Sequence, residues 1–218
     1  VMAAAGIKTY LNDVSMEIVE SRLQFIDKLL EKDVSRGKID ENTKGSIMAN
    51  LIPSNQLEDA ADCDIVIEAI LEKMEIKSSV FQKLDSVCKP DCILASNTSS
   101  LPITEIAAVT QRPEKVIGMH FMNPVPVMKL VEIIRGIATS DETYQQIKSL
   151  TLDLQKVPVE VRDVPGFVSN RVLQMMINEA VYCLYEGVAS VEDIDTVMKL
   201  GMNHPMGPLQ LADFIGLD

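Results

Sequence analysis

Short apolar runs alternate with helical patterns along most of this 218-residue chain, and this alternation constrains the fold more than any other feature. Apolar runs of strand length occur at residues 64–69, 92–96 and 115–121, and residues 73–87 repeat apolar side chains at helical spacing. Strands and helices that alternate over short connections form right-handed βαβ units in a parallel sheet. We therefore predict an α/β fold with a mostly parallel sheet.

The alternation ends at the segment Asp163-Val164-Pro165-Gly166. A helix and a strand between residues 140 and 161 still belong to the α/β pattern, whereas every later segment is helical in pattern. These later helices are predicted at residues 167–186, 191–200 and 208–215. We predict an α/β domain over residues 1–162 and an all-helical domain over residues 163–218.

The helix predicted at residues 167–186 is apolar around nearly its whole circumference. A helix without a polar face is usually buried, so we expect it to lie between the domains or in an oligomer interface. We expect at least a dimer, because a monomer should not expose such a surface. Asn170 is a polar exception near the helix start, and its amide needs hydrogen-bonding partners. Those partners are either backbone groups or an oxygen atom of a substrate.

Composition and charge disfavour several classes of function. The formal net charge of −12 argues against nucleic acid or an anionic membrane surface as the main partner. No apolar run reaches the roughly 18 residues that a membrane-spanning helix needs. The 4 cysteines form no CxxC pair, as is typical of reduced thiols in a cytosolic-type protein, and with 2 histidines we expect no metal site.

Residues 115–121 and 128–134 are two β-prone runs around a proline-rich segment that cannot continue a strand ladder. If the turn is centred near Pro126, antiparallel pairing places His120 opposite Glu132, with Cβ atoms about 4.5–5.5 Å apart. A carboxylate held against an imidazole fixes its tautomer, favours the imidazolium and makes a general base. The alternative is a half-buried histidine beside a solvated glutamate, with no catalytic role.

Further polar side chains directly follow the predicted strands. Glu68 and Glu72 follow one strand, and Asn97 and Ser99 follow the next. Because ligands bind beyond the carboxyl ends of parallel strands, we expect these side chains to form a site together with His120. Ser99 alone could instead cap the helix that follows it.

Near the amino terminus, residues 7–11 form an apolar strand that is followed by Asn12 and Asp13. A nucleotide-binding sheet places the carboxylate that binds an adenosine ribose at such a strand end, about 20 residues after a Gly-rich phosphate loop. No such loop precedes Asp13 in this sequence. Either Asp13 caps the next helix, or the chain lacks the opening β-loop-α unit.

An amphipathic helix predicted at residues 15–32 leads into a basic cluster within an otherwise acidic chain. Such a cluster is either a solvated face or a receptor for a polyphosphate tail. Its members are Lys28, Lys32, Arg36, Lys38 and Lys44.

Five motifs occur in order along the chain: residues 96–100 (SNTSS), 118–124 (GMHFMNP), 128–132 (MKLVE), 165–171 (PGFVSNR) and 204–208 (HPMGP). Each motif is weak alone. Together, over the whole chain and with similar spacings, they resemble the 3-hydroxyacyl-CoA dehydrogenase family. The resemblance implies a Rossmann-like NAD-binding domain, followed by a helical domain for substrate binding and dimerisation.

The resemblance also implies roles for the reacting groups. The reaction would be hydride transfer between NAD and carbon 3 of a 3-hydroxyacyl-CoA. His120 would be the general base on the 3-hydroxyl group, with Glu132 as its orienting partner. Ser99 and Asn170 would hydrogen-bond at the reacting oxygen and at the histidine.

Asp13, Glu72, Lys77 and Asn97 fall where the family contacts NAD, and a carboxylate at Asp13 would favour NAD over NADP because it repels a 2′-phosphate. The resemblance implies an acyl-CoA substrate, a homodimer or larger homo-oligomer, and a cytoplasmic location, or the mitochondrial matrix in a eukaryote. The family's first strand, Gly-rich loop, most of its first helix and the end of its helical domain have no counterpart here. We therefore expect these 218 residues alone to bind NADH weakly.

Two alternatives to this function stay open. One is a related dehydrogenase of the same family that acts on a hydroxy acid and does not require CoA. The other is a non-catalytic fragment that only binds CoA or supports an oligomer.

Overall fold

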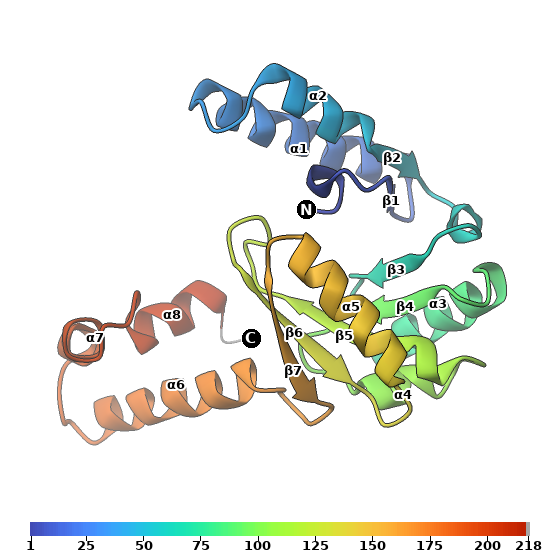
Figure 1. Cartoon of the computed structure of the whole chain (residues 1–218). Coiled ribbons are helices and arrows are strands. Elements are labelled where there is room, and N and C mark those ends of the chain that lie inside the picture. The colour runs from blue at the N-terminus through green and yellow to red at the C-terminus, as the bar shows by residue number, and fades with distance from the viewer. Residues whose placement is uncertain (217–218) are drawn as a thin grey trace. The chain divides into compact units, whose positions relative to one another are not determined.

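The structure is a computed structural model that describes residues 1–216. The backbone divides between Val164 and Pro165 into two compact units. The first is an α/β unit that holds the strands assigned within the described residues, and the second is a helical unit (Figure 1).

The strands of the α/β unit form two sheets within the described residues. They are β1 Thr9–Asn12, β2 Leu51–Ser54, β3 Ile65–Glu68, β4 Ile93–Ser96, β5 Val116–Phe121, β6 Leu130–Arg135 and β7 Val157–Arg162. β1 pairs with β2 in parallel, and the larger sheet has the order β3-β4-β5-β6-β7. Its neighbouring strands are parallel except for β5 and β6. The predicted α/β fold with a mostly parallel sheet is confirmed.

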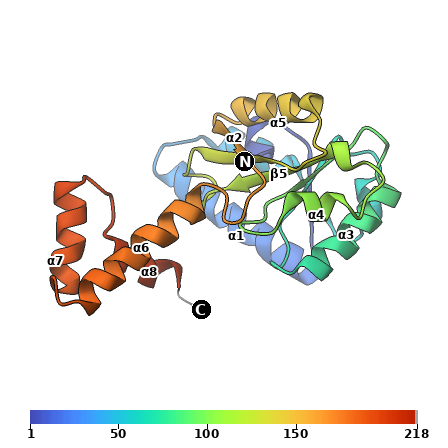
Figure 2. The same cartoon turned by 90° about the horizontal axis from the view of Figure 1, so that it is seen from below.

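Helices cover both faces of the larger sheet. The helices of this unit are α1 Met16–Ser35, α2 Glu41–Ala49, α3 Met74–Val87, α4 Ile103–Ala107 and α5 Asp141–Asp153, with 3-10 turns η1 Ala3–Ala5, η2 Leu57–Ala60 and η3 Pro113–Lys115. Figure 2 shows α5 on one side of β5, and α3 and α4 on the other. Every residue of β4 is buried, as expected of a strand covered on both faces.

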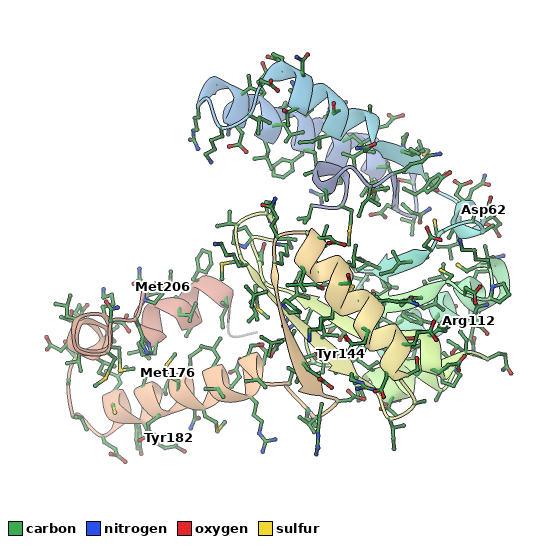
Figure 3. The ribbon with its side chains drawn as sticks, viewed as in Figure 1. Asp62, Arg112, Tyr144, Met176, Tyr182 and Met206 are labelled. Carbon is green, nitrogen blue, oxygen red and sulfur yellow. The ribbon has the colours of Figure 1, made fainter. Side chains whose placement is uncertain are left out.

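The core lies between the central strands and α5. Ile117 and Met119 of β5 and Ile133 of β6 are fully buried and pack with Ile147 and Tyr144 of α5. Tyr144 lies on α5, in front of the sheet in the view of Figure 3. These alternating strand residues give the sheet one continuous apolar face, which anchors the hairpin that carries His120.

The first helix begins at Ser15, whose hydroxyl accepts the N–H of Ile18 at 3.3 Å. Of the two alternatives for Asp13, the helix cap is therefore excluded, because Ser15 caps this helix. α2 and β2 lie outside the elements predicted from sequence. α2 begins after Asp40, whose carboxylate accepts the N–H of Thr43 at 2.7 Å, and hydrogen bonds from Thr43 lower the pKa of Asp40.

Acidic neighbours neutralise part of the basic cluster. Lys44 lies 3.0 Å from Asp27 and 2.8 Å from Glu31, and Lys38 lies 3.1 Å from Asp33. Two of the five residues of the basic cluster thus form ion pairs within the α/β unit. For these two, a solvated surface is favoured over a binding site for a polyphosphate tail.

The helical unit consists of α6 Ser169–Tyr185, α7 Val191–Thr196, the π-helical turn η4 Val197–Gly201 and α8 Pro208–Ile215. Asp195, 6% exposed, accepts the N–H groups of Leu209 and Gln210, each at 2.9 Å, and so fixes the start of α8. A Cβ atom on Gly207 would lie 2.2 Å from Asp195 Cγ, so only glycine allows this close approach. No helix within residues 1–216 is long and apolar enough to span a membrane.

α6 is only partly buried in the single chain. Ile177 and Ala180 are buried, whereas Met175 is 64% exposed and Tyr182 is 51% exposed. Tyr182 projects from α6 (Figure 3). α6 thus keeps exposed apolar side chains in the single chain, and its burial between the domains or in an oligomer interface stays a prediction.

Candidate active site

His120 and Glu132 are paired across the antiparallel strands β5 and β6. The Nδ1 atom of His120 lies 2.8 Å from Oε2 of Glu132. Both side chains are buried, with 8% and 2% of their surface exposed. The predicted pairing is confirmed, and a solvated glutamate is excluded. With the carboxylate at Nδ1, the ring is oriented so that Nε2 is the nitrogen that can serve a substrate.

The turn that joins β5 to β6 is held by Lys156, which lies just before β7. Its ammonium donates hydrogen bonds to the carbonyl oxygens of Val125 and Met128, both at 2.7 Å. Burial lowers the pKa of Lys156. The turn also contains a cis peptide bond between Asn123 and Pro124. A residue from outside the hairpin thus fixes the backbone that follows His120.

The loop after β4, residues 97–102, is called the serine loop below. It presents Ser99, which is exposed. The Oε1 atom of Glu72 accepts hydrogen bonds from the N–H of Ser99 at 2.8 Å, the N–H of Ser100 at 3.1 Å and the hydroxyl of Thr98. The carboxylate that follows β3 therefore organises the loop that follows β4.

A buried ion pair lies beneath the serine loop. The ammonium of Lys77 in α3 lies 2.7 Å from Glu68 and 3.2 Å from Glu72. Glu68, 4% exposed, also accepts the hydroxyl of Ser96 at 2.7 Å. Burial alone would raise the pKa of Glu72, but the hydrogen bonds from Thr98 and the serine loop and the charge of Lys77 outweigh it and lower that pKa.

The serine loop is fixed at both ends. The side-chain oxygen of Asn97 accepts the N–H of Phe121 at 2.9 Å, which joins the loop to the residue after His120. At the other end, the carboxylate of Asp163 accepts the first two N–H groups of α4, at 3.0 and 2.7 Å. Asp163, rather than Ser99, therefore caps this helix.

Asp13 lies at the end of β1 with its side chain exposed. Its carboxylate accepts the N–H of Val14 at 2.7 Å. The neighbouring amide of Asn12 donates to the hydroxyl of Ser54 at 2.8 Å and to the carbonyl of Gln56 at 3.1 Å. These hydrogen bonds tie the end of β1 to the residues around β2, and the carboxylate of Asp13 is exposed to solvent.

Asn170 lies in the first turn of α6 and is half-buried. It belongs to the helical unit, whereas Ser99, His120 and Glu132 belong to the α/β unit. Its role at the reacting groups stays a prediction.

Comparison with known protein families decides what this arrangement is. The family described as "3-hydroxyacyl-CoA dehydrogenase, NAD binding domain" matches residues 1–164. The family described as "3-hydroxyacyl-CoA dehydrogenase, C-terminal domain" matches residues 166–218. The chain belongs to the 3-hydroxyacyl-CoA dehydrogenase family.

Relatives of this dehydrogenase share its whole length. A Bacillus subtilis protein named "Probable 3-hydroxybutyryl-CoA dehydrogenase" is 60% identical over 216 residues, which cover 99% of this chain and 75% of that protein. The 3-hydroxybutyryl-CoA dehydrogenase of Bradyrhizobium diazoefficiens is 51% identical, over 100% of this chain and 74% of that protein. A crystal structure of (S)-3-hydroxybutyryl-CoA dehydrogenase from Ralstonia eutropha is 46% identical and superposes with a TM-score of 0.97, over 99% of this chain and 76% of that one.

The cofactor of this dehydrogenase family is NAD, and the polar strand ends of the α/β unit fit it. The exposed carboxylate of Asp13 suits the hydroxyl groups of a ribose. The serine loop offers hydroxyl groups beyond the carboxyl end of β4, which is where ligands of such sheets bind. Among the described residues, no three His, Cys, Asp or Glu side chains gather as they would around a metal ion.

Lys156 and Asp163, which hold the loops around the site of this dehydrogenase, were not among the residues predicted from the sequence. Their contacts join positions 28 to 60 residues apart, so no local pattern contains them. Asp163 follows β7 directly, but β7 runs antiparallel to β3 and β4, so Asp163 lies at the opposite edge of the sheet from Glu68 and Asn97. A search for polar residues at the carboxyl ends of the parallel strands does not find it. Lys156 is a single lysine between a helix and a strand, and nothing in the sequence distinguishes it.

Proposed function

We propose that this dehydrogenase interconverts (S)-3-hydroxybutyryl-CoA and acetoacetyl-CoA with NAD. The observation that carries the proposal is the buried pair of His120 and Glu132, whose atoms Nδ1 and Oε2 lie 2.8 Å apart. Such a pair is suited to remove a proton from a hydroxyl group and to return it. The names of the Bacillus and Bradyrhizobium relatives support a four-carbon acyl group.

When bound, NADH would supply the hydride for carbon 3 in reduction, and NAD would accept that hydride in oxidation. In reduction, protonated His120 donates its Nε2 proton to the oxygen on carbon 3; in oxidation, the neutral ring accepts the hydroxyl proton at Nε2. Glu132 holds Nδ1, so the ring keeps its orientation and the imidazolium has a counter-charge. Because the pair is buried, the attraction between the two charges is stronger than it would be in water.

We assign Ser99 to a hydrogen bond with the reacting oxygen and Asn170 to one with His120 or that oxygen. Two facts support the assignment of Ser99. It is exposed on a loop that Glu72 and Asp163 fix, and the start of this loop is tied to the end of β5 directly after His120. Asn170 is supported by its half-buried amide near the start of α6.

We assign Asp13, Glu72, Lys77 and Asn97 to the cofactor site. The exposed carboxylate of Asp13 would bind the adenosine ribose and repel a 2′-phosphate, which selects NAD over NADP. Glu72 and Asn97 lie in the connections after β3 and β4, beside the serine loop. That position suits the nicotinamide half of the cofactor, close to the catalytic pair.

We further propose a homodimer or larger homo-oligomer, because α6 exposes large apolar side chains in the single chain. The bacterial relatives support a cytoplasmic location over the mitochondrial matrix.

The test is the NADH-dependent reduction of acetoacetyl-CoA by the full-length protein. We expect turnover with the CoA thioester, little with free acetoacetate, and a strong preference for NADH over NADPH. Equal turnover with free acetoacetate would favour the alternative, a dehydrogenase that does not require CoA. Binding of acetoacetyl-CoA without turnover would favour a non-catalytic protein.

A further inference from the structure

The catalytic pair lies close to the open end of the hairpin that β5 and β6 form. The antiparallel register ends where Phe121 lies opposite Val131. His120 and Glu132 form the pair next to this last one. The ends of a strand ladder open more readily than its middle. The alignment of the catalytic pair therefore depends on what closes the turn between the two strands.

The turn spans residues 122–129, and one side chain from outside the hairpin joins its two halves. Lys156 lies directly before β7 and is 7% exposed. Its ammonium donates to the carbonyl of Val125 on the β5 side and to the carbonyl of Met128 on the β6 side, each at 2.7 Å. Figure 1 shows the turn and the start of β7 at the same end of the sheet. The turn is thus held against the start of β7.

The backbone beside Lys156 extends this contact into the sheet. The N–H of Val157 donates to the carbonyl of Lys129 at 2.8 Å, and the parallel pairing of β6 with β7 begins there. Two residues farther along, Glu132 lies opposite Val159. The strand that carries Glu132 is therefore placed against β7 at the same point where Lys156 holds the turn.

A role in stability alone does not explain why a lysine occupies this place. Among residues 1–216, no carboxylate forms an ion pair with Lys156, so only carbonyl dipoles face its charge. A buried ammonium without an anionic partner costs free energy. We propose that Lys156 is a positioning residue that closes the hairpin turn and so keeps His120 and Glu132 aligned for proton transfer. This inference rests on the function proposed for these two residues.

The first measurement does not depend on activity. In the full-length protein with isotope-labelled histidine, the Nδ1 proton of His120 is followed by NMR and is identified by its loss in His120→Gln. Lys156→Met removes the ammonium but keeps a side chain of similar length. We expect the Nδ1 proton to exchange with water about tenfold faster or more in this variant, as for the weakening of a hydrogen bond to a charged group. Wild-type exchange in a folded Lys156→Met protein would overturn the proposal.

The amides of Val127 and Met128 report on the turn itself, because both donate to the carbonyl of Pro124, at 2.9 and 3.0 Å. Their exchange should also accelerate in Lys156→Met, while exchange in α5 stays unchanged. If that variant does not fold, Lys156→Gln is measured in its place, because its amide can still donate to a carbonyl of the turn. Failure of both variants to fold would show that Lys156 acts through stability and would overturn the proposal.

The second measurement is steady-state kinetics with acetoacetyl-CoA and NADH. In Lys156→Met, kcat should fall about 10²-fold, as for a misplacement of about 1 Å, while the KM for acetoacetyl-CoA changes little. In a Glu132→Gln background, Lys156→Met should cost little more, because both changes act on the orientation of the same imidazole ring. A higher KM with kcat retained would show that the turn binds the substrate instead. Either that result or a full additional loss in the Glu132→Gln background would overturn the proposal.

Lys148→Met is the matched control. Lys148 lies on α5, in the connection that leads to Lys156, and its ammonium lies 5.9 Å from the ring centre of Tyr144. This change removes one positive charge without touching the turn, so both measurements should match the wild type. An equal loss in Lys148→Met would overturn the proposal. If the wild-type protein does not reduce acetoacetyl-CoA, the proposed function fails, whereas the exchange measurements still decide whether Lys156 holds the pair in place.

Discussion

Glu132 is buried against the imidazole ring of His120, with 2% of its side-chain surface exposed. Glu132→Gln keeps the shape and the reach to Nδ1 but removes the negative charge. The imidazolium formed during turnover then lacks its counter-charge, so we expect kcat to fall about 10²- to 10⁴-fold. The KM for acetoacetyl-CoA should change little, because the pair acts on the reacting oxygen. Steady-state rates over a range of pH measure both effects.

Two further variants sharpen this prediction. His120→Gln should lose at least as much activity, and the double variant should lose far less than the product of the two effects, because the residues act as a unit. Glu160→Gln is the control; it removes a carboxylate that is 49% exposed on the neighbouring strand β7, and should retain activity. Near-normal turnover in Glu132→Gln would mean that His120 is a strand histidine without a catalytic role.

Glu72 makes the order of the serine loop dependent on pH. Burial would raise its pKa, but the hydrogen bonds from Thr98 and Ser99 and the charge of Lys77 hold it below the ordinary value of 4.5. A carboxylate whose pKa is lowered by folding stabilises the folded state fully at pH values above its unfolded-state pKa. This stabilisation is lost as the pH falls through the lowered, folded-state pKa. We expect protection of the serine-loop amides to decrease progressively below pH 4.5.

Amide hydrogen exchange, corrected for its intrinsic dependence on pH, measures this effect. Glu72→Gln is the control, because the loop should then show the same protection across this range. Wild-type protection that stays constant through the range would mean that the charge of Glu72 does not hold the loop.

Two carboxylate contacts of the site differ in how far the sequence predicts them. His120 and Glu132 lie 12 positions apart across one turn, so counting from the turn gives their register. Glu72 and Ser99 lie 27 positions apart, in two different strand-to-helix connections. Their contact depends on how neighbouring βα units pack, and no local pattern contains that information. The sequence therefore predicts both residues as polar groups at a sheet edge, but not that one holds the other.

At the scale of elements, the contact between α4 and β5 depends on a glycine. A Cβ atom on Gly118 would lie 2.8 Å from Cβ of Ile134 and 3.0 Å from Cδ1 of Ile103. Gly118→Ala must therefore push α4 or β6 away, and we expect a loss of about 1–3 kcal/mol in the free energy of unfolding. Urea denaturation measures this loss as a lower midpoint.

Gly45→Ala is the matched control for this change. Gly45 lies inside α2, and a Cβ atom there would meet nothing within 4 Å. Alanine at this helical position should be neutral or stabilising by up to about 1 kcal/mol. Equal midpoints for the two alanine variants would show that α4 does not pack on β5 as described.

α2 and β2 show why some elements escape sequence analysis. α2 has no buried residue and contains Gly45, so it lacks the apolar stripe that marks a helix. β2 contains Pro53, which normally argues against a strand. β2 nevertheless forms, because it pairs in parallel with β1, with Thr9 opposite Leu51. This pairing joins residues that are far apart in the sequence, so no short stretch of sequence predicts it. The buried strands and the long helices are predictable because each has its own pattern of apolar residues.

At the scale of the whole molecule, the helical unit has an apolar surface. Met175 is 64% exposed, Tyr185 is 84% exposed, and Leu200 and Phe214 are 82% and 77% exposed. Monomeric proteins rarely expose a large contiguous apolar patch. The sequence predicts that such a surface exists, because residues 167–186 have no polar face. It does not predict which side chains face outward, since α7 and α8 cover only part of α6.

We therefore expect the full-length protein to be at least a homodimer through its helical unit. Met175 and Tyr182 lie two turns apart on one face of α6, with 64% and 51% exposed. Met175→Asp and Tyr182→Asp place charge on this face without touching the buried Ile177 and Ala180, so helical content should persist while the mass measured by light scattering falls to that of a monomer. Phe25→Asp changes a side chain that is 55% exposed on α1 and should leave the assembly intact. A stable wild-type monomer at micromolar concentration, or a dimer that survives both charged substitutions, would contradict association through this face.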